Sequence, residues 1–188
     1  SDREPHLLAL TATPIPRTLA LTVYGDLSIS TIRELPPGRQ PIRTEIRDRR
    51  ALPKIQEFLA SEARERRQSF VVVPLVAESE ALEAASAEAE VERLRNALAE
   101  LRIGLVHGQL RVDERDATMT AFAAGEMDLL VATTVIEVGI DVPNASVILI
   151  EDAERFGLAQ LHQLRGRVGR GAHRSFCILL SESTDPLA

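Results

Sequence analysis

Residues 103–132, IGLVHGQLRVDERDATMTAFAAGEMDLLVA, decide the fold class of this chain. The apolar runs from Ile103 to Val106 and from Leu129 to Ala132 predict two strands. Between them, the stretch from Val112 to Ala124 predicts a helix that Gly125 ends. Strands that are apolar throughout and alternate with helices are typical of a parallel sheet covered on both faces.

The same alternation continues on both sides of this unit. Further strands are predicted from Phe70 to Leu75, from Ser146 to Ile150 and from Ser175 to Leu180, with a helix from Ala84 to Leu101. The acidic stretch 78–92 is the expected mobile loop before that helix. The predicted fold class is therefore α/β, a parallel sheet with helices on both faces.

The first part of the chain has a different organisation. A strand is predicted from His6 to Thr11 and a helix from Arg17 to Val23, before Pro36-Pro37-Gly38 breaks the chain. We expect a domain boundary within residues 25–40. The first ~25 residues are too few to form a domain, so they should be the tail of a preceding one. The abrupt start likewise predicts a piece of a longer chain.

Composition limits the possible classes of protein. The net charge of −6 argues against a stand-alone nucleic-acid binder, which is usually basic. No apolar stretch approaches the ~20 residues that a membrane span needs. The single cysteine, Cys177, lies in an apolar segment and is interpreted as a core thiol, in keeping with a reducing cytoplasm.

The strongest chemical signal is the octet from Gln163 to Arg170, QLRGRVGR. The i, i+3 spacing of Arg167 and Arg170 predicts that both project from one face of a short helix end. Two guanidiniums aimed at one point repel each other unless an anion lies between them, and a polyphosphate is the natural anion. An arginine that reaches a γ-phosphate is typically worth ~10³–10⁵ in rate. The alternative is a solvated basic helix end.

A second signal begins where the strand ending at Ala132 stops. The hydroxyls of Thr133 and Thr134 can bond a nucleic-acid phosphate. Gly139 permits a close backbone approach, and Asp141 could accept a hydrogen bond from a ribose hydroxyl. Ligands of open α/β sheets gather at the carboxyl ends of strands. Taken alone, however, this is an ordinary strand-to-turn segment.

Two weaker signals also lie at predicted strand ends. They are Thr11 to Thr18, TATPIPRT, and Val106 to Gln109, VHGQ. His107 alone is as compatible with a structural role as with a functional one. The sequence holds no phosphate-cradling G-x-x-x-x-G-K-[ST], no His and Cys cluster for zinc and no Gly-x-Ser-x-Gly. No metal-ligating residue is therefore predicted.

These motifs together closely resemble the superfamily-two helicases, and within them the RecG branch-migration helicases, over nearly the whole chain. In order, the family's motifs III, V and VI are similar to residues 11–18, 133–141 and 163–170. The resemblance to RecG in particular is carried by Tyr24 to Leu27, Glu34 to Arg39 and Pro74 to Glu80. The string from Phe156 to Arg167 is shared with the transcription-repair coupling translocase and does not separate the two.

The resemblance implies a RecA-like fold, the P-loop NTPase-like C-terminal domain of a helicase. Residues 1–27 would be the tail of the first RecA-like domain, with the strand and helix of motif III, and residues 28–188 the second domain. ATP and Mg²⁺ would be bound mainly by the first domain of the same chain.

The resemblance also implies roles for single residues. Arg167 and Arg170 would contact the γ-phosphate of ATP, with Gln163 orienting that site. Gly139 and Asp141 would face the nucleotide sugar.

The remaining motif residues would contact DNA or couple the two domains. The DNA contacts implied by the resemblance are Thr133, Thr134, His107, Gly108 and Arg17. Thr11 and Thr13 would couple the nucleotide state to domain movement.

The implied function is that of the second motor domain of a cytoplasmic, ATP-dependent DNA helicase or translocase. Such a motor remodels stalled forks and Holliday junctions in recombination and repair, and this part would be inactive as an ATPase alone. The implied partners are branched DNA, the first RecA-like domain and, by family analogy, single-stranded-DNA-binding protein, with no membrane. The alternatives are the motor domain of the coupling translocase and a non-catalytic α/β interaction module.

Overall fold

The structure of the chain is a computed structural model that describes residues 30, 41–74, 80–133 and 142–182. The chain divides into two compact units, residues 1–35 and 36–188. All the described helices and strands belong to the second unit. The strand predicted at residues 6–11 and the helix predicted at 17–23 lie outside the described residues. The predicted division after residue 27 falls within the first unit and stays a prediction.

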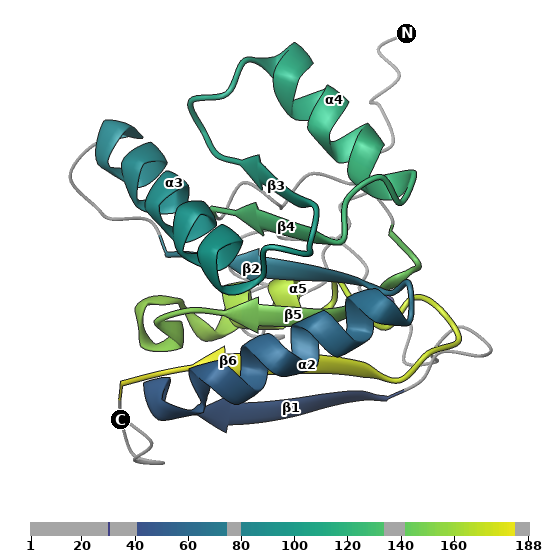
Figure 1. Cartoon of the computed structure of the whole chain (residues 1–188). Coiled ribbons are helices and arrows are strands. Elements are labelled where there is room, and N and C mark those ends of the chain that lie inside the picture. Colours follow the sequence, from purple (N-terminus) through teal and green to yellow (C-terminus); the bar gives the residue numbers. More distant parts are fainter. Residues whose placement is uncertain (1–29, 31–40, 75–79, 134–141, 183–188) are drawn as a thin grey trace, which may run out of the picture. The chain divides into compact units, whose positions relative to one another are not determined.

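Six strands form one sheet in the order β1-β6-β5-β2-β4-β3 (Figure 1). Every neighbouring pair is parallel, as the sequence predicts. The strands are β1 (Ile42–Arg47), β2 (Gln68–Val72), β3 (Ile103–Val106), β4 (Leu129–Ala132), β5 (Ala145–Ile150) and β6 (Ser175–Leu180). Since β2, β4 and β5 have completely buried residues, they form the centre of the hydrophobic core.

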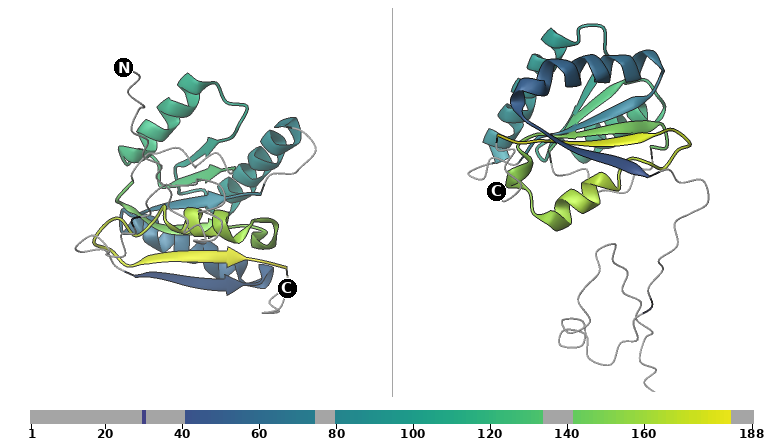
Figure 2. Two further views of the ribbon diagram at one scale, coloured as in Figure 1. Left: turned by 180° about the vertical axis from the view of Figure 1, so that it is seen from behind. Right: turned by 90° about the horizontal axis from the view of Figure 1, so that it is seen from below.

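In the described part of the chain, four α-helices cover the two faces of the sheet (Figure 2). They are α2 (Leu52–Arg64), α3 (Glu80–Ala97), α4 (Val112–Ala123) and α5 (Leu158–Arg165), with short 3₁₀ turns η1 (Arg49–Ala51) and η3 (Ala153–Arg155). Leu59 of α2 and Leu94 of α3 pack into one apolar cluster. Phe122 of α4 and Leu164 of α5 pack into the other, on the opposite face. The predicted two-faced coverage is therefore confirmed.

The start of α3 differs from the sequence prediction, and the end of α4 agrees with it. Helix α3 begins at Glu80, so the mobile loop predicted for 78–92 is wrong from that residue onward. Alanine and glutamate have high helix propensity, and burial of Val91 and Leu94 adds tertiary stabilisation. Gly125 does end α4, with the left-handed φ of +78° that glycine adopts without strain.

Strand β1 and helix α2 are not predicted from the sequence pattern. Strand β1 is the charged edge strand, where Arg43, Glu45 and Arg47 form ion pairs along one face. Such charges are typical of sheet edges, where they prevent pairing with other chains. The strand exists because it pairs with β6, which its own composition does not indicate.

Cys177 is buried in β6, as expected of a core thiol. Burial raises the pKa of the Cys177 thiol to about 11, and the positive charge of Arg165 acts in the opposite direction. A thiol with so high a pKa is a poor nucleophile at neutral pH. In the described part of the chain, no helix is long and apolar enough to cross a bilayer.

Candidate functional site

His107 and Thr133 directly follow the neighbouring strands β3 and β4, at the carboxyl edge of the sheet. The Thr133 N–H donates to the carbonyl of Val106 over 3.2 Å, which joins the two strand ends. His107 is 7% exposed and Thr133 is fully buried. In the described part of the chain, His107 Nδ1 and Thr133 Oγ1 have no hydrogen-bond partner. A buried unpaired polar group costs about 1–3 kcal/mol, so both atoms require an explanation.

This burial bears on the predicted DNA contacts. Gly108 is exposed beside His107, but the Thr133 hydroxyl does not reach the surface in this conformation. Thr134, Arg17 and the two predicted coupling residues, Thr11 and Thr13, lie outside the described residues.

The predicted arginines lie beyond α5, in residues 166–171, which we call the arginine turn. Helix α5 ends at Arg165 with Gly166 as its C-cap, and Gly169 has a φ of +78°. The prediction that Arg167 and Arg170 share one face of a helix is therefore wrong. The glycines end the helix first, so the two guanidiniums are carried by irregular backbone.

The arginine turn is fixed by packing at its centre and at its end. Val168 is fully buried in the same apolar cluster as Leu164. A Cβ atom on Gly171 would lie 2.3 Å from the carbonyl oxygen of Pro143, so the two backbone segments are in close contact there. Pro143 closely follows Gly139 and Asp141, which lie outside the described residues.

The arginine turn and the buried pair His107–Thr133 occupy opposite edges of the sheet. The turn precedes β6 and packs against Pro143, which precedes β5. His107 and Thr133 instead follow their strands. The two signals that the sequence predicts therefore lie at opposite ends of the strands.

The exposed residues around the turn have their own local contacts. Gln163 is exposed on α5. Arg170 is exposed, and its Nε donates to the carbonyl of Gly166 over 3.2 Å. Arg167 is half-buried.

Arg165, the first arginine of the octet, does not join the other two. Its Nε donates to Thr44 Oγ1 over 3.0 Å, and its Nη2 donates to the carbonyl of Ile42 over 3.2 Å. Both acceptors belong to β1. The three arginines of the octet are therefore divided between an internal contact and the turn.

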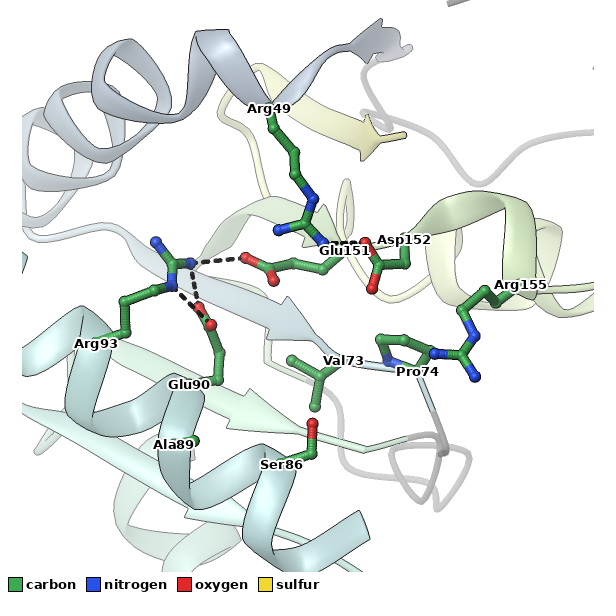
Figure 3. Close-up of a pocket in the computed structure, with 10 residues that line it drawn as sticks. All are labelled: Arg49, Val73, Pro74, Ser86, Ala89, Glu90, Arg93, Glu151, Asp152 and Arg155. Atoms are coloured by element: carbon green, nitrogen blue, oxygen red, sulfur yellow. Dashed lines mark hydrogen bonds and ion pairs between the residues drawn. The ribbon is translucent and has the colours of Figure 1, made fainter. Parts of the chain in front are cut away.

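A pocket of about 290 Å³ lies at the carboxyl edge of β2 and β5, against α3 (Figure 3). Arg93 Nη2 donates to Glu151 over 2.8 Å, and Arg93 Nε donates to Glu90 over 2.8 Å. Beside them, Arg49 forms an ion pair with Asp152. This pocket was not predicted from the sequence, because its residues come from separate segments of the chain.

Glu151 is the buried carboxyl of this pocket, with 5% of its surface exposed. Burial, followed by the negative charge of Glu90, raises the pKa of Glu151 to about 7, while Arg93 acts in the opposite direction. Its position directly after β5 was the one available signal in the sequence, since polar residues at such strand ends often belong to ligand sites.

Comparison with known proteins identifies the class. Residues 50–172 match the family described as helicase conserved C-terminal domain. The chain therefore belongs to this family, whose domains are RecA-like, as the sequence implied.

The relatives that it matches within that class include RecG helicases, which confirms the resemblance inferred from the motifs. It is 57% identical to the ATP-dependent DNA helicase RecG of Mycobacterium tuberculosis (strain ATCC 25618 / H37Rv), over 94% of this chain and 26% of the relative. It is 59% identical to RecG of Escherichia coli O127:H6, over 94% and 26%. A solved structure of RecG bound to a three-way DNA junction matches with a TM-score of 0.76 and 47% identity, over 90% of this chain and 22% of that one. The chain spans about a quarter of the length of these relatives.

Proposed function

We propose that this chain is the second motor domain of an ATP-dependent DNA helicase that remodels branched DNA, such as stalled forks and Holliday junctions. The observation that carries the proposal is the arginine turn. It presents Arg167 and Arg170 on a segment held by buried Val168 and by the contact of Gly171 with Pro143. The RecG relatives, named as ATP-dependent DNA helicases, support the assignment of this turn to a motor.

The proposed role of the turn is to supply positive charge to the γ-phosphate of ATP. Donors that are already fixed stabilise developing charge without reorganising during the reaction. Arginines of this kind typically contribute ~10³–10⁵ in rate to phosphoryl transfer. Gln163, exposed on α5, would orient the pair, and Gly139 and Asp141 would face the sugar.

We propose that ATP and Mg²⁺ are held mainly by the first RecA-like domain. The two arginines of the turn fit the charge of a polyphosphate. Among the described residues, no group of three or more His, Cys, Asp or Glu lies where it could hold a metal ion. Bound magnesium would neutralise phosphate charge, and this chain would add the arginines when the two domains close. Loss of the γ-phosphate would release the turn and let the domains separate.

The proposed DNA contacts are Gly108, His107, Thr133 and Thr134, with Arg17. The unpaired polar atoms of His107 and Thr133 support a ligand at the carboxyl edge. Because the Thr133 hydroxyl is buried, its contact with a phosphate requires a second conformation in which it is exposed. An alternation of this kind is what a DNA motor needs, since its grip on the strand must change during each cycle.

The proposed partners follow from the same assignment. They are branched DNA, the first RecA-like domain and single-stranded-DNA-binding protein, in the cytoplasm. The described Thr133 and His107 would meet the DNA, and the arginine turn would meet the first domain. Thr11 and Thr13 would couple the two.

The test is Arg170→Ala in the longer protein that carries this chain. We expect the DNA-stimulated ATPase rate to fall by about 10³-fold or more, because transition-state charge loses its stabilisation. Binding to a three-way junction, measured without nucleotide, should remain. The 188-residue chain alone should show no ATPase activity.

Arg50→Ala is the matched control. The Arg50 side chain is 92% exposed and pairs only locally with Asp48, so the ATPase rate should not change. An unchanged rate in the Arg170 variant would contradict the proposal and favour a non-catalytic interaction module.

A further inference from the structure

Arg165 is the last residue of α5 and the first arginine of the octet, yet it is directed into the domain. Its guanidinium uses two nitrogens, Nε and Nη2, on Thr44 Oγ1 and on the carbonyl of Ile42. Its positive charge also opposes the rise that burial causes in the pKa of Cys177, a thiol in β6, next to β1. The side chain is half-buried and lies over the start of these two strands.

The arginine turn follows Arg165 directly, and two backbone hydrogen bonds hold its first residues. The Gly166 N–H donates to the carbonyl of His162 over 3.2 Å, and the Arg167 N–H donates to the carbonyl of Leu164 over 2.9 Å. The far end is held where Gly171 meets Pro143. The position of the turn therefore depends on how firmly the end of α5 is attached to the sheet.

We propose that Arg165 is a positioning residue, which sets the reach of Arg167 and Arg170 toward nucleotide by tying the end of α5 to β1. The inference rests on the proposed function, because it assumes that the turn acts on ATP. Arg165 itself would not contact phosphate, because the two nitrogens that would serve a bidentate contact donate to β1 instead.

The chemistry of the contact explains why the residue is an arginine. The guanidinium fork reaches a hydroxyl and a backbone carbonyl at once, and lysine has only one nitrogen with which to do so. Thr44 is exposed on the edge strand, so replacing it by valine removes the acceptor oxygen while it preserves the shape and β propensity of the residue. Thr44 thus offers a way to weaken the contact without altering the octet.

The experiment measures ATP hydrolysis by the longer protein with Thr44→Val, Arg165→Lys and the double variant. Each single change should lower kcat about tenfold, less than the ~10²-fold that a misplacement of 1 Å can cause. KM for ATP should change little, because the weakened interaction is that of the arginine turn with the γ-phosphate in the transition state. The double variant should be no worse than Arg165→Lys, since both changes break the same contact.

Arg43→Ala is the matched control, because Arg43 is an exposed arginine of β1 that pairs with Glu45. Its kcat should equal that of the unchanged protein, and all variants should keep their melting temperature. This separates positioning from a general loss of stability.

Three outcomes would overturn the inference. If Thr44→Val leaves kcat unchanged while Arg165→Lys lowers it, the hydrogen bond to Thr44 does not set the position of the turn, and the proposed tie is wrong. If neither variant changes kcat while Arg170→Ala abolishes activity, the proposed function stands and the positioning role is wrong. If Arg170→Ala also has no effect, the proposed function itself fails.

Discussion

The carboxyl of Glu151 provides a sharp test of the energetics of this fold. It is 5% exposed, and its pKa is raised from 4.5 to about 7 by burial and by the neighbouring Glu90. Arg93 holds both carboxyls and opposes the shift. The perturbation is Glu151→Gln, which keeps the shape of the neutral carboxyl and removes its ionisation (Figure 3).

The magnitude follows from the difference between the two pKa values. Each unit corresponds to 1.36 kcal/mol, so a shift from 4.5 to about 7 amounts to about 3 kcal/mol for Glu151. Between these values the unfolded chain has released a proton that the folded chain still binds. The free energy of unfolding therefore falls as pH rises through this window. Below pH 4.5 this loss of unfolding free energy is absent, and above about pH 7 it is complete.

The assay is urea denaturation of the 188-residue chain and of the Glu151→Gln variant at pH 5 and pH 8. Near pH 5 the two should be about equally stable. At pH 8 the variant should be more stable by up to about 3 kcal/mol, because it has no charge to bury. Glu100→Gln is the control: Glu100 is exposed and pairs with Arg64 at the surface, so its effect should be small at both pH values.

A variant that loses stability between pH 5 and pH 8, relative to the unchanged chain, would refute this reasoning. It would mean that the ion pair of Glu151 with Arg93 outweighs the burial of its charge. An advantage of equal size at both pH values would be equally contradictory, since the effect would then have no connection with ionisation.

Two further predictions concern single positions in the second unit. Gly171→Ala should lower the free energy of unfolding by about 1–3 kcal/mol, because the new Cβ would overlap the Pro143 carbonyl oxygen at 2.3 Å. Urea denaturation measures this, and unchanged stability would mean that the arginine turn can shift freely. Cys177, whose pKa is raised to about 11 by burial, should react with a thiol reagent at pH 8 only when the chain unfolds. Rapid labelling of the native chain would show that the thiol is accessible.

Strands with a buried, continuous apolar sequence could be predicted from local information. The predicted bounds of Ile103–Val106, Leu129–Ala132 and Ser175–Leu180 agree with β3, β4 and β6. A continuous apolar strand is stable when both of its faces are buried, and helices between such strands are typical of a parallel sheet. Strand β1 could not be predicted in this way, because its charged residues are stable as a strand only when β6 pairs with them.

The octet illustrates the limit for the site. Three arginines lie within six residues, and the local sequence does not distinguish their environments. The structure separates Arg165 from Arg167 and Arg170, because β1 supplies two acceptors at the end of α5. The pocket is similar, since Arg93 and Glu151 are 58 positions apart and meet only in the folded chain.

The sequence by itself determined the parallel α/β class, the helicase family and the segments that carry the chemistry, because apolar patterning and motif spacing are local properties. The tertiary structure alone decided which arginine is internal and which polar groups are buried without partners. It also decided that the arginine turn and the His107–Thr133 pair occupy opposite edges of the sheet. These features depend on strand order and on contacts between distant segments, which no stretch of sequence contains.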